Sequence, residues 1–128
     1  KRDNSLNVTD FLKHSSEGIQ LFLKETYNLQ VEIKENYDLI LNERKFLGCS
    51  LYMPRGWCYY SAVILLDRAA LAMINKYLSM PSKEPKHRQG RSHEDFLVPL
   101  KEHIDCTFSS FQHDLEEFML ATDWVAGP

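Results

Sequence analysis

The stretch from Trp57 to Leu78 reads WCYYSAVILLDRAALAMINKYL and decides the predicted fold. On a helical projection its apolar side chains cover nearly the whole circumference, and a helix that is apolar all round is normally surrounded by other helices. We therefore expect this segment to be the central and most buried helix of a bundle. Asp67 and Arg68 stand near its middle, and because charges are costly in hydrocarbon, a core helix is favoured over a membrane span.

Before this segment, a first amphipathic helix is predicted over residues 8–27, where apolar residues recur at steps of three and four. Asn7 or Thr9 can cap its first turn through a side-chain oxygen. The sequence Ser15-Ser16-Glu17-Gly18 weakens the middle, since serine and glycine are poor helix-interior residues, so a local break is expected there.

Residues 29–53 are compatible with two structures. One is a helix that ends at Gly48, and its apolar positions are Leu29, Ile33, Tyr37, Ile40 and Leu47. The other is a hairpin with a turn at Glu35-Asn36, and its alternating apolar residues are Leu29, Val31, Ile33, Leu39 and Leu41. The helix is slightly favoured because the neighbouring segments are predicted to be helical.

After the central segment, residues 79–91 form a predicted loop that is rich in proline and polar residues. Ser92 can cap a new helix by accepting from the backbone N–H of Asp95, with the Asp95 carboxylate reaching back. Pro99 kinks this helix or begins another, which should run to about Ala121. The apolar stripe of this last helix is Leu100, Ile104, Phe108, Phe111, Leu115 and Phe118.

The predicted fold class is therefore all-α, an antiparallel bundle of four to five helices in which residues 29–53 could form a hairpin instead of a helix. The chain has 128 residues, the length of one domain, and we predict a single helical domain over 1–128. Because it starts at Lys1 without a methionine, we expect a fragment of a larger protein. Trp124 and Val125 are expected to pack back on the bundle.

Charge and cysteine content narrow the class of protein. The net charge of −3 at pH 7 excludes a general polyanion-binding surface, so any contact with nucleic acid must be local. Cys49, Cys58 and Cys106 have no metal-binding spacing and indicate reduced thiols in a cytoplasmic protein. The acceptor motif Asn7-Val8-Thr9 supports a secreted location, which is the less favoured alternative. The sequence indicates neither a metal site nor a cofactor.

The basic loop provides the candidate site. Lys83, Lys86 and Arg91 form a predicted phosphate-binding patch in front of a helix. Arg88 can hold a phosphate through two N–H groups, and His93 can accept a proton near neutral pH. Together Arg88 and His93 are the candidate catalytic pair for RNA cleavage without a metal. The plainer alternative is a solvated loop in which His93 makes only a local hydrogen bond.

The chain resembles a HEPN domain over about residues 57–105. The resemblance is carried by Tyr59-Tyr60-Ser61-Ala62, by the small residues Ala69, Ala70 and Ala72, and by the stretch that begins at His93. Four residues separate Arg88 from His93, a spacing similar to that of the arginine–histidine motif of this family. The resemblance implies an antiparallel helical bundle that commonly dimerises, and either metal-independent ribonuclease activity or inactive binding of nucleotides or partners.

Two functions follow. The first is a HEPN-like domain that binds RNA or a nucleotide through the 83–93 loop and is a possible metal-independent ribonuclease. The second is a non-catalytic helical module for protein–protein interaction or oligomerisation within a larger assembly. A homodimer or a protein partner, and no membrane contact, is expected in either case.

Overall fold

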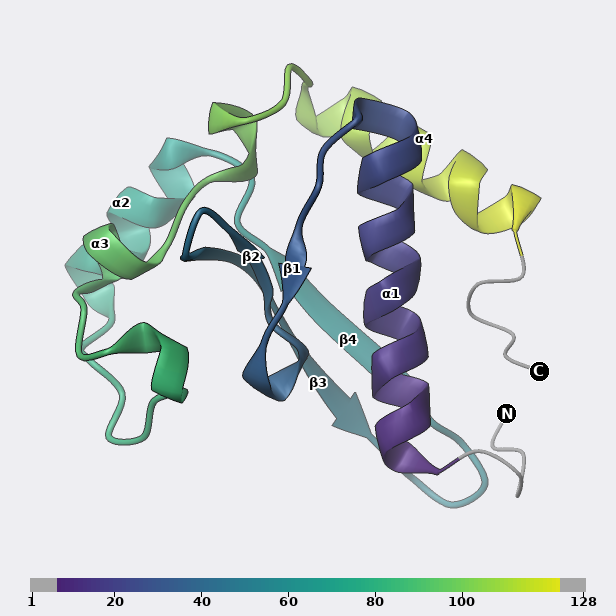
Figure 1. The fold of residues 1–128 in the computed structure, drawn as a ribbon, viewed down its shortest axis with the longest axis horizontal. Coiled ribbons are helices and arrows are strands. Elements are labelled where there is room, and N and C mark those ends of the chain that lie inside the picture. The colour runs from purple at the N-terminus through teal and green to yellow at the C-terminus, as the bar shows by residue number, and fades with distance from the viewer. Residues whose placement is uncertain (1–6, 123–128) are drawn as a thin grey trace.

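The computed structural model describes residues 7–122, which form an α/β fold with an antiparallel sheet in strand order β1-β2-β3-β4 (Figure 1). The strands are β1 (Glu32–Ile33), β2 (Leu39–Leu41), β3 (Arg44–Tyr52) and β4 (Tyr59–Ile64). The helices are α1 (Val8–Tyr27), α2 (Arg68–Tyr77), α3 (His93–Phe96) and α4 (Phe108–Ala121). Short 3-10 turns are η1 (Glu35–Tyr37), η2 (Lys86–Arg88) and η3 (Leu100–Glu102).

The predicted all-α bundle is wrong, and the error begins in the stretch from Trp57 to Leu78. Its first half is strand β4, whose exposure alternates residue by residue, and Val63 is 75% exposed. Asp67 then ends the apolar run, because its carboxylate accepts from the N–H of Ala70 and caps the separate helix α2. Aromatic and β-branched residues in the first half favour a strand, so the all-round apolar pattern came from joining two different elements.

Residues 29–53 contain the strands β1, β2 and β3, so the favoured helix is wrong and the hairpin alternative is confirmed. Glu32 pairs with Ile40 across the turn, and β3 continues the sheet beside β2. Asn36 and Tyr37 in the turn have positive φ angles of 64° and 60°. This left-handed backbone ends any helical path at the expected turn.

The predictions at the N-terminal helix are largely confirmed. Helix α1 spans Val8–Tyr27, and the Asn7 side chain accepts from the N–H of Asp10. The expected break at Ser15–Gly18 does not occur. Ser15, Ser16 and Gly18 are buried there, and their small size lets the helix pack closely on the rest of the fold.

The C-terminal part differs in detail from its prediction. Ser92 caps α3 as expected, with its hydroxyl oxygen 3.2 Å from the backbone nitrogen of Asp95. Pro99 precedes η3 rather than one long helix, and α4 begins only at Phe108, after a Thr107 cap. The C-terminal end of α4, Ala121, is as predicted. Trp124 and Val125 lie outside the described residues.

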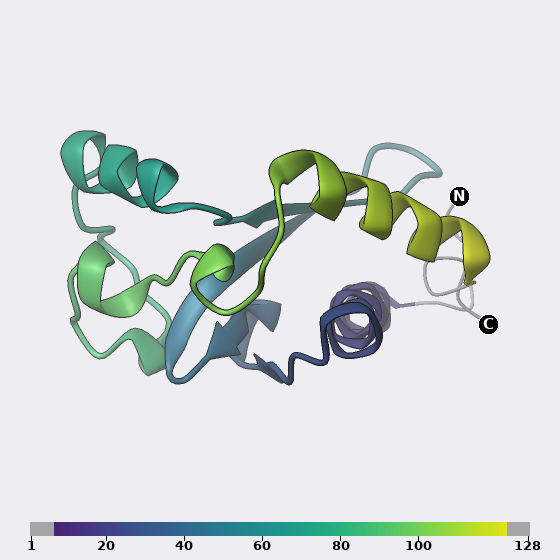
Figure 2. The same ribbon diagram turned by 90° about the horizontal axis from the view of Figure 1, so that it is seen from above.

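The hydrophobic core lies between one face of the sheet and the helices α1 and α4. The Phe22 ring of α1 contacts the Phe111 ring of α4, with 5.6 Å between the ring centroids. Helices α2 and α3 lie side by side at the opposite end of the molecule (Figures 1 and 2). Within residues 7–122, no helix is both long and apolar enough to cross a membrane.

The other face of β3 and β4 carries little of the core. Gly48 pairs with Val63, Ser50 with Ser61, and Tyr52 with Tyr59, and each pair shares this face. Tyr52 and Tyr59 are 68% and 53% exposed. This open side of the sheet, bounded by α2 at one end, is where the candidate site lies.

Two phenylalanines of α4 provide a test of the core. Phe111 is 6% exposed and Phe108 is 69% exposed, although both belong to the stripe predicted from sequence. Phe111→Ala is therefore expected to lower the free energy of unfolding by about 3–5 kcal/mol, as aromatic truncation in a core does. Phe108→Ala, its matched control, should cost less than about 0.5 kcal/mol. Urea denaturation measures both, and equal losses would contradict this placement of α4.

Candidate active site

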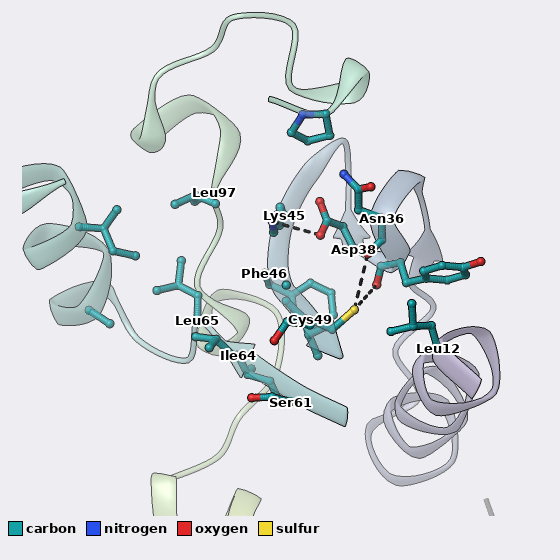
Figure 3. A pocket seen from close by; sticks show the side chains of 18 of the residues that line it. Leu12, Asn36, Asp38, Lys45, Phe46, Cys49, Ser61, Ile64, Leu65 and Leu97 are labelled. Atoms are coloured by element: carbon teal, nitrogen blue, oxygen red, sulfur yellow. Dashed lines mark hydrogen bonds and ion pairs between the residues drawn. The ribbon is translucent and has the colours of Figure 1, made fainter. Parts of the chain in front are cut away.

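A pocket of about 990 Å³ opens between the β3–β4 sheet, helix α2 and the turn at η1 (Figure 3). Most of its lining is apolar, with Phe46, Leu65 and Met73 among the larger side chains. The lining also includes two charged residues, Asp38 and Lys45. A large apolar pocket with a few converging polar groups is the usual form of a small-molecule site.

The charged pair at the pocket is held in close contact. Lys45 Nζ lies 3.1 Å from Asp38 Oδ1. The Asp38 side chain is 4% exposed and that of Lys45 is 26% exposed, so the lysine is the partner that reaches solvent. The second oxygen of the same carboxylate, Asp38 Oδ2, lies 3.1 Å from His87 Nε2. The pocket therefore has a positively charged group whose counter-ion is buried beneath it.

The backbone around Lys45 is fixed by the segment that follows α3. The Lys45 carbonyl accepts from the N–H of Val98 at 2.9 Å, and a parallel bridge joins Lys45 to Leu97. The Arg44 guanidinium donates to the carbonyls of Glu94 and Leu97. These bonds hold the first residues of β3 in place, so the Lys45 side chain starts from a rigid position.

Asp38 is placed by the turn between β1 and β2. The left-handed residues Asn36 and Tyr37 reverse the chain immediately before it, and the Asp38 carbonyl accepts from the N–H of Lys34 at 2.9 Å. Strand β2 follows at once with Leu39, which is fully buried. The short turn between β1 and β2 therefore places the Asp38 carboxylate at the pocket.

Gly48 makes room for the lysine ammonium. A Cβ atom added at Gly48 would lie 3.0 Å from both Lys45 Cε and Lys45 Nζ. The space above this glycine is therefore occupied by the end of the Lys45 side chain, which lies across β3 toward Asp38.

Cys49 also lines the pocket but is not arranged as a nucleophile. Its thiol donates weakly to the carbonyls of Asn36 and Tyr37, and burial raises the pKa of the Cys49 thiol. Burial likewise raises the pKa of the neighbouring Tyr60 to about 12, and the Tyr60 hydroxyl lies 3.3 Å from the Ser16 hydroxyl. A thiol that stays protonated at neutral pH attacks poorly, so this cluster serves packing.

The sequence-predicted pair, Arg88 and His93, is brought together, with Arg88 Nη2 3.1 Å from His93 Nδ1. Arg88 is 5% exposed and also donates to the Arg91 carbonyl. The other ring nitrogen, His93 Nε2, lies 3.1 Å from the carbonyl oxygen of Leu78. Guanidinium and carbonyl partners fix His93 with its proton on Nε2, and both side chains hold the 78–93 segment together.

The predicted phosphate patch is divided. Lys83 and Lys86 are exposed, whereas the Arg91 guanidinium donates to the carbonyls of His87 and Arg88. Phosphate binding by Lys83, Lys86 and Arg91 stays a prediction, as do the RNA, nucleotide and dimer partners.

Sequence reasoning missed the two charged residues of the pocket lining, Asp38 and Lys45. The available signal was a lysine inside an apolar strand pattern with a glycine three residues later. A charged residue in such a pattern needs either solvent or a buried partner, and here it has Asp38.

Comparisons with known proteins show which proteins this chain is similar to. A family model described as the lipoyl protein ligase A/B catalytic domain matches residues 1–120. Among solved structures, the chain is similar to lipoate-protein ligase A in its crystal structure bound with ATP, with a TM-score of 0.71 and 15% sequence identity. That match covers 94% of this chain and 47% of the other, so this chain spans about half the length of the solved protein. The comparison with curated proteins found no match.

These findings overturn the HEPN resemblance and, with it, both functions expected from sequence. Tyr59-Tyr60-Ser61-Ala62, which carried the resemblance, lies in strand β4 rather than in a helix. RNA cleavage and the non-catalytic helical interaction module are therefore both wrong. With 120 of its residues matched by the family model, this chain belongs to the lipoyl protein ligase A/B catalytic domain family.

Proposed function

We propose that this chain binds lipoate, or a similar medium-chain acid, and takes part in ATP-dependent activation of its carboxyl group for transfer to a protein amine. One observation carries the proposal: an apolar pocket lined by the Lys45–Asp38 pair, in a chain of this family. The similarity to an ATP-bound ligase supports ATP as the co-substrate.

The pocket suits the two ends of such an acid. Its apolar walls, which include Phe46, Ile64 and Met73, match a hydrocarbon chain ending in a dithiolane ring. A carboxylate needs a cation when it leaves water, and the Lys45 ammonium supplies one. Asp38, whose side chain is almost fully buried, pairs with the Lys45 ammonium and holds it in place.

Lys45 would also assist the chemistry. When a carboxylate oxygen attacks a phosphorus of ATP, a new O–P bond forms, the bond to the leaving phosphate breaks, and charge grows on the phosphate oxygens. A preplaced ammonium stabilises that charge more than it stabilises the separate reactants. An amine then attacks the activated carbonyl carbon and expels the phosphate-bearing group, which completes the transfer.

The test uses hydroxylamine as a simple amine that traps activated acyl groups. The protein, incubated with lipoate, ATP and hydroxylamine, should form lipoyl hydroxamate, measured by mass spectrometry, with one ATP consumed per hydroxamate. Acetate, which is too short to reach along the apolar walls, should be a poor substrate. ATP consumption that is the same with and without lipoate would overturn the proposal.

Gly48→Ala gives a second test, because it displaces the Lys45 ammonium without disturbing the core. Its Cβ would lie 3.0 Å from the flexible end of the lysine and in ordinary contact with Asp38 Oδ1 at 3.9 Å. The rate of hydroxamate formation is expected to fall about 10- to 100-fold, the cost of a catalytic group misplaced by about 1 Å. The free energy of unfolding should change by less than about 1 kcal/mol. Ser109→Ala, at an exposed position of α4 that does not line the pocket, is the control that should retain full activity.

A further inference from the structure

His87 contacts Asp38 of the pocket lining, although the two residues are far apart in the sequence. It belongs to η2, whereas Asp38 follows η1, yet His87 Nε2 lies 3.1 Å from Asp38 Oδ2. The His87 side chain is 9% exposed, and its ring packs near the ring of Phe96 with 5.6 Å between centroids. Its other nitrogen, Nδ1, is buried and has no hydrogen-bond partner among the described residues.

This arrangement fixes which atom of the ring carries the proton. A carboxylate oxygen accepts, so Nε2–H of His87 donates to Asp38 and Nδ1 bears the lone pair. An N–H at Nδ1 would be buried without an acceptor, whereas an unpaired acceptor there is less costly than an unpaired donor. The His87 ring therefore donates a hydrogen bond to the Asp38 carboxylate through Nε2.

The segment that carries His87 is itself anchored at this point. The Glu35 carboxylate of η1 accepts from the backbone N–H of Lys86 at 2.9 Å. Arg88, on the other side of His87, is buried with its guanidinium 4.8 Å from the centre of the Phe96 ring. His87 is therefore held between two fixed residues rather than on a free loop.

From these contacts we infer that His87 is a positioning residue for Lys45, acting through Asp38. The carboxylate has one partner on each oxygen, Lys45 on Oδ1 and His87 on Oδ2. With Oδ2 occupied, the carboxylate cannot rotate to offer both oxygens to the ammonium. Lys45 is held through Oδ1 alone, and its remaining N–H groups are left for a ligand in the pocket.

The catalytic consequence rests on the proposed function, whereas the effect on Lys45 does not. If the carboxylate is released from His87, both of its oxygens can close on the lysine. The ammonium is then held more tightly and sits deeper. Lys45 becomes a poorer partner for a carboxylate or phosphate, and its amine is less accessible from the pocket.

Two amide substitutions separate positioning from simple packing. His87→Gln places its terminal amide N–H near the position of Nε2 and can still donate to Asp38. His87→Asn is one methylene shorter and places its amide near Nδ1, short of the carboxylate. Both variants remain polar and similar in shape, so a loss of packing affects both. His113→Gln, at an exposed histidine of α4, is the control for the substitution itself.

The first readout is the kinetics of lipoyl hydroxamate formation. His87→Asn is expected to lower kcat about 10- to 100-fold, because Lys45 is then misplaced, while the KM for ATP stays within about twofold. His87→Gln should remain within about threefold of the unsubstituted protein. Equal losses of kcat in the two variants would show that His87 only packs the loop, and would overturn the inference.

The second readout needs no activity. Acetic anhydride acetylates neutral amines, and mass spectrometry gives the rate at Lys45 relative to exposed Lys83 in the same chain. His87→Asn should slow Lys45 acetylation by about threefold or more, because the ion pair tightens, and His87→Gln should leave it unchanged. Unchanged Lys45 acetylation in His87→Asn would overturn the inference. The expected acetylation pattern in a protein that forms no hydroxamate would support the positioning role and count only against the proposed function.

Discussion

Lys45→Ala is expected to lower lipoate-dependent hydroxamate formation by about 100- to 1000-fold, the loss that follows removal of one preplaced group that stabilises transition-state charge. Lys45 is the cation that lines the apolar pocket. Without it, a carboxylate entering the pocket has no counter-ion, and growing charge on the phosphate is unsupported. The loss should appear in kcat as well as in the KM for lipoate, because the ammonium contacts both states.

Lys83→Ala is the matched control, since Lys83 is exposed on the basic loop and does not line the pocket. Its activity should stay within about twofold of the unsubstituted protein. A Lys45→Ala variant that is folded and retains more than about a tenth of the activity would show that the pocket works without this lysine.

Asp38→Ala is expected to have the second-largest effect, because it removes the partner of two side chains at once. Lys45 and His87 would each lose an acceptor at about 3.1 Å. Breaking a buried pair leaves uncompensated polar groups, so the free energy of unfolding should fall by about 3 kcal/mol. Activity should fall as well, because Lys45 is no longer held at the pocket.

Urea denaturation checks the change in stability, and hydroxamate formation at a temperature where the variant is folded checks activity. Asp105→Ala, at an exposed aspartate before α4, should change the free energy of unfolding by less than about 0.5 kcal/mol. If Asp38→Ala were as stable as this control, the carboxylate would not be the anchor of the site.

The sequence correctly predicted those features of the fold that depend only on neighbouring residues. The cap at Asn7, the length of α1, the cap at Ser92 and the end of α4 at Ala121 follow from short-range rules. The stretch from Trp57 to Leu78 failed because its apolar pattern does not separate a strand from a helix. Strand β4 and helix α2 are separated just before Asp67, which caps α2 although it stands within the apolar run.

The site was less accessible to sequence reasoning than the fold. Asp38, Lys45 and His87 come from the end of a turn, a strand and a 3-10 turn, and only tertiary folding brings them together. Arg88 and His93 attracted attention because they are close in sequence, yet their nearness serves to hold the 78–93 segment. A spacing motif reports proximity along the chain, whereas a pocket is assembled from distant segments.

The most direct test of Lys45 as the ligand-binding cation is its protection by substrate. Acetic anhydride labelling with mass spectrometric readout should be run on the unsubstituted protein, with and without lipoate and ATP. With both present, acetylation of Lys45 is expected to slow by about tenfold, because a bound carboxylate or phosphate pairs with the ammonium and covers it. Lys83 and Lys86 should react at unchanged rates. Protection of Lys83 and Lys86 with Lys45 unaffected would contradict the assignment of the pocket and place the ligand on the basic loop instead.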